Sequence, residues 1–300
     1  MKEGAAPRGR RAQTLGPGGI DRHKTGNKEV ETSLYERENG SGKSMNHGIV
    51  EIGGLRFGAG LPKVCVPLVS PSEPGLKEEI RACLALPADL LEWRADCFFA
   101  DPLDALPLVC REAGRRPLLV TLRRNEEGGK ASLSAEAYEE LLWNLLERGG
   151  FSLLDVELSA GEDRVRRLAH RARERNIGLV VSRHDFEKTP GEEEMVSTLV
   201  RMKELGADLP KLAVMPQCPG DVLTLLSATL RASAQVGPVI TMAMGSLGKV
   251  SRVCGGITGS CLTFGAGDSA SAPGQLNAED LKAILQDLDP WEGEKGEGNP

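Results

Sequence analysis

The feature that most constrains the fold of this chain is an alternation of short apolar runs with amphipathic stretches, repeated eight times. The apolar runs predict buried strands at 63–68, 89–94, 117–123, 152–158, 178–184, 210–215, 238–244 and 260–265. The stretches between them have helical spacing, as at 136–147, 162–175 and 278–288. Such alternation favours parallel strands joined by right-handed crossovers. Eight units in about 225 residues predict an α/β fold, a (β/α)8 TIM barrel.

A doubly wound open sheet would show the same alternation, but no GxGxxG motif follows the first strand. Ahead of the barrel, residues 49–57 predict a β-hairpin with a Gly53-Gly54 turn, which we expect to cap the barrel bottom. Residues 1–46 are polar, Gly-rich and without hydrophobic period, which predicts a disordered extension. We therefore expect the barrel domain to span 47–288 and residues 289–300 to form a second disordered tail.

Composition excludes several classes of function. The net charge of −6 gives no indication of binding to nucleic acid or to an anionic membrane. No apolar run approaches the ~18 residues that span a bilayer. The 7 cysteines include no CxxC pair, and the 4 histidines show no clustered ligand spacing, so we expect no metal site. Reduced thiols and the absence of a signal sequence predict a cytoplasmic protein.

The strands carry polar side chains on one face only. Successive side chains of a strand point to opposite faces, and one parity of the central strands is purely apolar, which predicts contact with the helices. The other parity holds Glu92 and Arg94, Thr121 and Arg123, Asp155 and Glu157, Ser182 and His184, and Lys211. Most of these residues fall at the C-terminal strand ends, where barrel enzymes place their chemistry. Lys211 is the exception, because the pattern places it at the start of its strand.

Lys211 heads the short apolar run Lys211–Pro216. Burying an unpaired ammonium is costly, so such a lysine needs compensation or a use for its amine. Desolvation favours the neutral amine, which can attack a carbonyl to form a Schiff base. The alternative is a strand-end lysine whose head group reaches into water.

The other polar residues also have structural interpretations. The strand carboxylates and arginines could neutralise one another in buried pairs. His184 could be a hydrogen-bonded core histidine, and Arg252 an exposed helix residue. Together, however, they equip one cavity with an imine-forming lysine, a histidine that can move protons and arginines that can bind a carboxylate. These are the groups needed to abstract a proton next to a ketone.

Six strings of sequence resemble one family, the type I 3-dehydroquinate dehydratases. They are Glu92–Arg94, Thr121–Arg123 with Glu127–Gly129, Ser182–Phe186, Lys211–Pro216, Met244–Gly245 through Ser251-Arg252, and Phe264-Gly265 through Ala270–Gln275. They occur in family order over nearly the whole patterned region. The resemblance implies a (β/α)8 barrel, usually homodimeric, without cofactor or metal, acting in the shikimate pathway on 3-dehydroquinate.

The resemblance also implies residue roles. Lys211 would form an imine with the C3 ketone of the substrate, and His184 would remove a C2 proton and then protonate the departing C1 hydroxyl. Glu127 would orient His184, and Arg252 would bind the substrate carboxylate. The ring hydroxyls would be held by Glu92, Arg94, Arg123, Ser271 and Gln275. The product would be 3-dehydroshikimate.

Two other functions remain open from the sequence. A barrel enzyme of the class I aldolase kind would also use a lysine on its sixth strand, but it would not predict the Ala270–Gln275 loop or Arg252. A non-catalytic binding protein on this scaffold would be expected to lack Lys211 or His184. Where some members of the family carry a hydroxyl residue at the end of the first strand, this chain has Pro67, so one minor substrate contact is not implied.

Overall fold

The computed structural model describes Met1, residues 48–267 and residues 274–289. Apart from Met1, these residues belong to one compact unit, Lys43–Pro300. The predictions made for residues 2–46, for Ser271 and for residues 290–300 lie outside the described residues and stay predictions.

The described chain confirms all eight predicted strands, each ending within two residues of its predicted bounds. The strands are β1 Val50–Ile52, β2 Leu55–Phe57, β3 Lys63–Leu68, β4 Leu90–Arg94, β5 Leu118–Thr121, β6 Leu153–Glu157, β7 Gly178–Asp185, β8 Leu209–Val214, β9 Ile240–Ala243, β10 Leu262–Ala266 and β11 Leu276–Asn277. The α-helices are α1 Glu73–Ala85, α2 Pro102–Ala113, α3 Ala135–Arg148, α4 Glu162–Glu174, α5 Glu192–Glu204, α6 Pro219–Val236, α7 Gly255–Thr258 and α8 Ala278–Asp287. The short 3-10 helices are η1 Ala95–Cys97, η2 Asn125–Glu127, η3 Leu158–Ala160 and η4 Leu247–Arg252.

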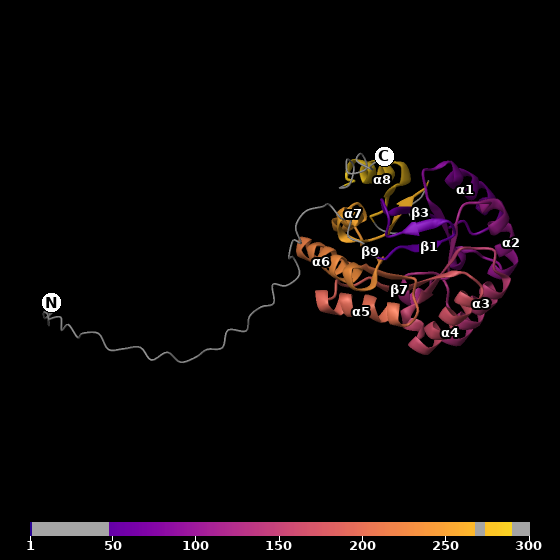
Figure 1. The fold of residues 1–300 in the computed structure, drawn as a ribbon, viewed down its shortest axis with the longest axis horizontal. Coiled ribbons are helices and arrows are strands. Elements are labelled where there is room, and N and C mark those ends of the chain that lie inside the picture. Colours follow the sequence, from indigo (N-terminus) through magenta and orange to yellow (C-terminus); the bar gives the residue numbers. More distant parts are fainter. Residues whose placement is uncertain (2–47, 268–273, 290–300) are drawn as a thin grey trace, which may run out of the picture. The chain divides into compact units, whose positions relative to one another are not determined.

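Strands β3 to β10 form a closed parallel barrel. Each pairs with the next in the chain from β3 to β9, and β10 pairs with β3, where Leu262 aligns with Lys63. The remaining seam is bridged by a parallel pairing of Val239 with Ser260, and the N–H of Cys261 donates to the Val239 carbonyl at 2.8 Å. Figure 1 shows the helices following one another around the outside of the strands. The fold is therefore the predicted (β/α)8 TIM barrel and not an open sheet.

The apolar side chains on the outer face of the strands pack against the helices, as predicted. Trp93, Val120 and Val156 are fully buried in one large cluster that includes Tyr138 and Leu142 of α3. This layer explains the amphipathic pattern of the helices, because only the stripe that faces the strands is removed from water. It also leaves the opposite face of each strand directed into the barrel.

The antiparallel hairpin β1–β2 closes the bottom of the barrel, as the sequence predicts. Its Phe57 is fully buried in a second cluster inside the barrel, whose lower part lies at the N-terminal strand ends. Ile52 packs so closely that a Cβ added to Gly178, the first residue of β7, would lie 2.5 Å from it. This cluster also contains Leu90, Leu119, Leu153, Val180 and Leu209. The lower half of the barrel interior is therefore apolar.

The expected position of Lys211 at the start of its strand is wrong. Lys211 is the third residue of β8, aligned with Ser182 of β7 and Ile240 of β9. The strand begins at Leu209, because Leu209 supplies part of the apolar inner layer at the barrel bottom. Lys211 consequently points into the barrel one layer above Leu209.

The hairpin gives a first prediction. Phe57→Ala should lower the free energy of unfolding by about 3–5 kcal/mol, because it leaves a cavity where the hairpin meets the barrel. Arg56→Ala is the matched control, since the Arg56 side chain is 59% exposed and only ion-pairs with Glu51, an interaction worth about 1 kcal/mol or less. Equilibrium unfolding in urea measures both changes. Equal losses for the two variants would contradict the role of the hairpin as a packed plug.

Candidate active site

A cavity of about 160 Å³ opens at the C-terminal ends of the barrel strands. It lies above the apolar inner layer, where the inward-pointing polar side chains of five consecutive strands come together. Of the nine residues predicted to form the site, eight line this cavity: Glu92, Arg94, Arg123, Glu127, His184, Lys211, Arg252 and Gln275. The ninth, Ser271, lies outside the described residues.

The amine of Lys211 lies at the base of the cavity. Lys211 is only 4% exposed, and its Nζ donates to Oδ2 of Asp155 at 3.0 Å. The Oε1 atom of Glu92 lies 3.9 Å from the same Nζ, and the ring centroid of Phe264 lies 4.7 Å from it. The lysine therefore does not reach bulk water, which excludes the alternative of a head group that extends into solvent.

Arg123 connects the carboxylates beneath the cavity. Its Nη2 donates to Asp155 at 2.8 Å, and its Nη1 donates to Ser182 at 2.9 Å and to Glu157 at 3.2 Å. Nη1 also lies 3.6 Å from Oε2 of Glu127. Because each carboxylate has a cation or an N–H donor within hydrogen-bond distance, the cluster is buried without an isolated charge.

His184 and Glu127 form a second hydrogen-bonded unit. Glu127 ends η2, and its Oε2 lies 2.9 Å from Nδ1 of His184 and accepts the backbone N–H of His184 at 3.0 Å. Ser159 of η3 donates to the other oxygen, Oε1, at 2.5 Å. With Nδ1 directed at the carboxylate, Nε2 is the ring nitrogen that can exchange protons with a ligand.

Burial and charge set the protonation of these groups. Burial opposes ionisation of Asp155, but the charges of Arg123 and Lys211 hold its pKa well below the usual range. Burial, together with the same two cations, lowers the pKa of His184 well below 6.5. Burial raises the pKa of Glu127 to about 7, although Arg123 opposes the shift. At neutral pH the His184 imidazole is therefore uncharged and able to act as a base.

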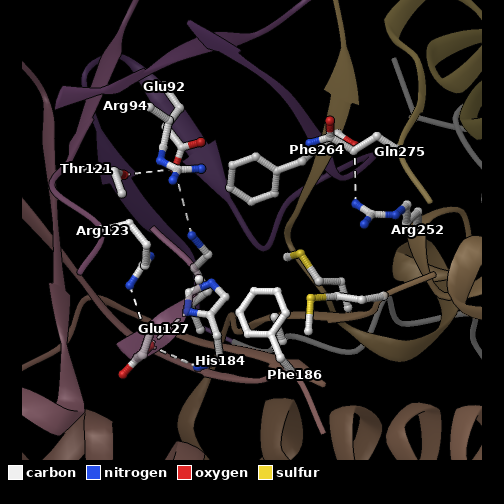
Figure 2. Close-up of a pocket in the computed structure, with 15 residues that line it drawn as sticks. Glu92, Arg94, Thr121, Arg123, Glu127, His184, Phe186, Arg252, Phe264 and Gln275 are labelled. Carbon is white, nitrogen blue, oxygen red and sulfur yellow. Dashed lines mark hydrogen bonds and ion pairs between the residues drawn. The ribbon is translucent and has the colours of Figure 1, made fainter. Parts of the chain in front are cut away.

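The opposite side of the cavity carries one buried arginine and an apolar wall. Figure 2 shows Arg252 and Gln275 across the cavity from Arg123 and His184. Arg252 is 2% exposed, and burial lowers the pKa of its guanidinium to about 10, which leaves it cationic at neutral pH. The wall between the two sides includes Phe186, Met242, Met244 and Phe264. A ligand in this space would be bound at one end by a cation and at the other by Lys211 and His184.

Comparison with known proteins agrees with this geometry. The type I 3-dehydroquinase family model matches residues 64–290 of the chain. A protein from Listeria monocytogenes serotype 4a, named 3-dehydroquinate dehydratase, is 45% identical over 248 residues, covering 80% of this chain and 97% of the relative. This chain belongs to the type I 3-dehydroquinase family. It is therefore an enzyme of the lyase class.

Solved structures agree with this assignment. The type I 3-dehydroquinate dehydratase from Clostridium difficile, solved with covalently modified comenic acid, superposes with a TM-score of 0.77 at 38% identity. The match covers 81% of this chain and 98% of that one. The 3-dehydroquinate dehydratase of Enterococcus faecalis superposes with a TM-score of 0.73, also at 38% identity, covering 80% of this chain and 99% of that one.

The predicted residue set did not include every residue that the geometry makes important. Asp155 contacts both Lys211 and Arg123. The alternation of the strand predicts that its side chain points into the barrel, but the sequence does not indicate these contacts. Ser159, which binds Glu127, lies in a 3-10 turn with no sequence signal. Glu92 accepts a hydrogen bond from Thr121 of the neighbouring strand at 2.8 Å. The only sequence signal for this contact is that both side chains are predicted to point into the barrel.

Neither a metal site nor a membrane span is found in the part of the chain that the structure describes. Within residues 48–267 and 274–289, no three His, Cys, Asp or Glu side chains are grouped so that they could hold a metal ion. None of the helices in these ranges is both long enough and apolar enough to cross a bilayer. The expectation that the enzyme uses no metal or cofactor stays a prediction.

The lowered pKa of His184 gives a second prediction. In the folded enzyme the His184 ring should titrate below pH 6.5, whereas in the unfolded chain its pKa is about 6.5. The unfolded chain therefore binds this proton more readily, so acidification through this range should favour unfolding. An NMR titration of the imidazole resonances, assigned with the His184→Gln variant, measures the value. A His184 resonance that titrates at or above pH 6.5 would contradict the buried, cation-flanked environment.

Proposed function

We propose that this enzyme removes water from 3-dehydroquinate to give 3-dehydroshikimate, by way of an imine on Lys211. Membership of the family and the names of its relatives support the reaction and its place in the shikimate pathway. The observation that carries the mechanism is the position of Lys211, buried in the cavity within 3.0 Å of Asp155. A lysine in this position can meet a carbonyl without competition from bulk water.

The first step forms the imine. Lys211 first releases one proton, and its amine then adds to the C3 carbonyl of the substrate. The released proton and a second one from the nitrogen pass to the carbonyl oxygen, which leaves as water and gives an iminium. Asp155, ionised and hydrogen-bonded to Nζ in the free enzyme, then serves as the counter-ion of the iminium. The iminium withdraws electrons from C2 more strongly than the ketone does, so the C2 proton can be removed by a weak base.

The second step eliminates the hydroxyl at C1. Neutral His184 takes the C2 proton through Nε2, while its Nδ1 stays hydrogen-bonded to Glu127 at 2.9 Å. The resulting imidazolium is stabilised by Glu127 and returns its proton to the departing hydroxyl, which leaves as water. Water then hydrolyses the imine, which restores Lys211 and releases the product. One water is consumed and two are released over the cycle, so the net change is the loss of one.

The remaining residues of the cavity would orient the ring. Arg252, buried and cationic, is placed to bind the substrate carboxylate opposite Lys211. We assign contacts with the ring hydroxyls to Glu92, Arg94 and Gln275, all of which line the cavity, and to Ser271. Arg123 also lines the cavity, but its guanidinium already donates to three oxygens of the buried network. We expect its contribution to substrate binding to be smaller than that of Arg94.

The wider predictions stay as proposals. We expect a cytoplasmic homodimer with a barrel domain over 47–288. We also expect residues 1–46 to be dispensable for turnover.

Two substitutions of Lys211 separate its charge from its nucleophilicity. Lys211→Ala should lose at least ~10³-fold in kcat, about 4 kcal/mol of transition-state stabilisation. Lys211→Arg keeps a cation beside Asp155 but should lose as much, because a guanidinium stays protonated and cannot add to the ketone. Formation of the conjugated enone product, followed by absorbance, measures the rates. Lys77→Ala on α1, outside the cavity, should leave them unchanged.

Retention of a tenth of the wild-type rate in Lys211→Ala would contradict covalent catalysis. The loss would then be only about 1.4 kcal/mol, which the deletion of a simple electrostatic contact could explain.

A further inference from the structure

Asp96 lies directly behind the candidate active site without contacting the cavity. Strand β4 ends at Arg94, and the chain turns at once into η1, where Asp96 reaches the backbone of Arg123 just beyond the end of β5. The Asp96 side chain has 0% exposed surface. Its two carboxylate oxygens accept four N–H groups: Nε and Nη2 of Arg94, and the backbone N–H groups of Arg123 and Lys130.

The bonds to Arg94 are a bidentate pair. Nε donates to Oδ1 and Nη2 donates to Oδ2, each at 2.8 Å. This geometry fixes the plane of the guanidinium, because both parallel bonds are kept in only one orientation. Burial alone would raise the pKa of Asp96, but hydrogen bonds and the charge of Arg94 hold it below its usual value. The pair is therefore ionic at neutral pH, and the remaining N–H groups of Arg94 are left to face the cavity.

The other two bonds hold the loop that carries Glu127. The backbone N–H of Arg123 donates to Oδ1 at 3.2 Å, and that of Lys130 donates to Oδ2 at 3.1 Å. These two residues lie on the two arms of the loop, which is closed by a hydrogen bond from the N–H of Ala131 to the Arg123 carbonyl at 3.1 Å. Glu127 lies between the two arms and reaches His184. One carboxylate thus contacts both arms of the loop and a lining arginine.

We propose that Asp96 is a positioning residue, which holds Arg94 in its substrate-binding orientation and fixes the loop that presents Glu127 to His184. The inference rests on the proposed function, since Arg94 is taken to bind the substrate. A purely structural Asp96 would instead only neutralise a buried arginine and support the barrel. The two interpretations differ in whether substrate affinity depends on the geometry of the carboxylate or only on its charge.

Asp96→Asn tests the geometry with little change in shape. The amide has one acceptor oxygen, so in either orientation its NH₂ group faces one Arg94 donor and one backbone N–H, and two of the four hydrogen bonds are lost. KM for 3-dehydroquinate should rise about 10- to 100-fold, and kcat should fall as well, because the loop loses its fixed position. The control is Asp101→Asn, an exposed N-cap of α2 whose carboxylate accepts the N–H of Leu103 at 2.8 Å. It should change neither constant more than about twofold.

Two further variants decide between the interpretations. Asp96→Glu restores the charge but moves both oxygens by one methylene, so KM should stay raised; recovery of the wild-type KM would overturn the proposal. In the background of Arg94→Gln, adding Asp96→Asn should raise KM no further while still lowering kcat, because Asp96 acts on binding through Arg94. If the two substitutions instead raised KM independently, so that their effects multiplied in the double variant, the proposal would be overturned. If Asp96→Asn does not fold, the Asp96→Glu result alone decides.

The outcomes also separate this inference from the proposed function. Suppose that the wild-type enzyme turns over 3-dehydroquinate and that Asp96→Asn has an unchanged KM. This result would overturn the inference alone, even if the melting temperature of the variant were lowered. Absence of wild-type turnover of 3-dehydroquinate would overturn both.

Discussion

The proposed chemistry of this barrel depends on the contact between Lys211 and Asp155 at the centre of a neutralised cluster. A lysine that is 4% exposed would be costly without its carboxylate at 3.0 Å. Asp155 in turn stays ionised because Arg123 lies 2.8 Å from it and Lys211 lies 3.0 Å from it. The same two cations suppress protonation of His184. A single set of contacts therefore holds the proposed nucleophile in place and keeps the proposed base uncharged.

The two layers of the barrel interior make this arrangement possible. The lower layer is apolar and closed by the hairpin through Phe57, which shields the ionic layer from solvent on that side. The upper layer is ionic and opens into the cavity, with Arg252 on the far side. The fold thus separates the part of the interior that stabilises the barrel from the part that we propose to bind and convert the substrate.

The sequence predicts the barrel and most of the cavity because both follow from strand periodicity. Parity alone places Glu92, Asp155 and His184 inside, and alternation fixes the order of the strands. The depth of Lys211 could not be predicted, since the inner apolar layer to which Leu209 belongs is assembled from many strands. The contacts of Asp96 and Ser159 depend on short 3-10 turns whose course sequence periodicity does not describe. Their partners are distant in the chain and come together only in the folded barrel.

The most direct test of the account is reductive trapping of the imine. Sodium borohydride added to the enzyme with 3-dehydroquinate should convert the imine to a stable secondary amine, with irreversible loss of activity. Peptide mass spectrometry should locate the added mass on Lys211, and borohydride without a carbonyl ligand should add none. An unmodified Lys211 in enzyme that is turning over substrate, or an adduct on another lysine, would contradict the account.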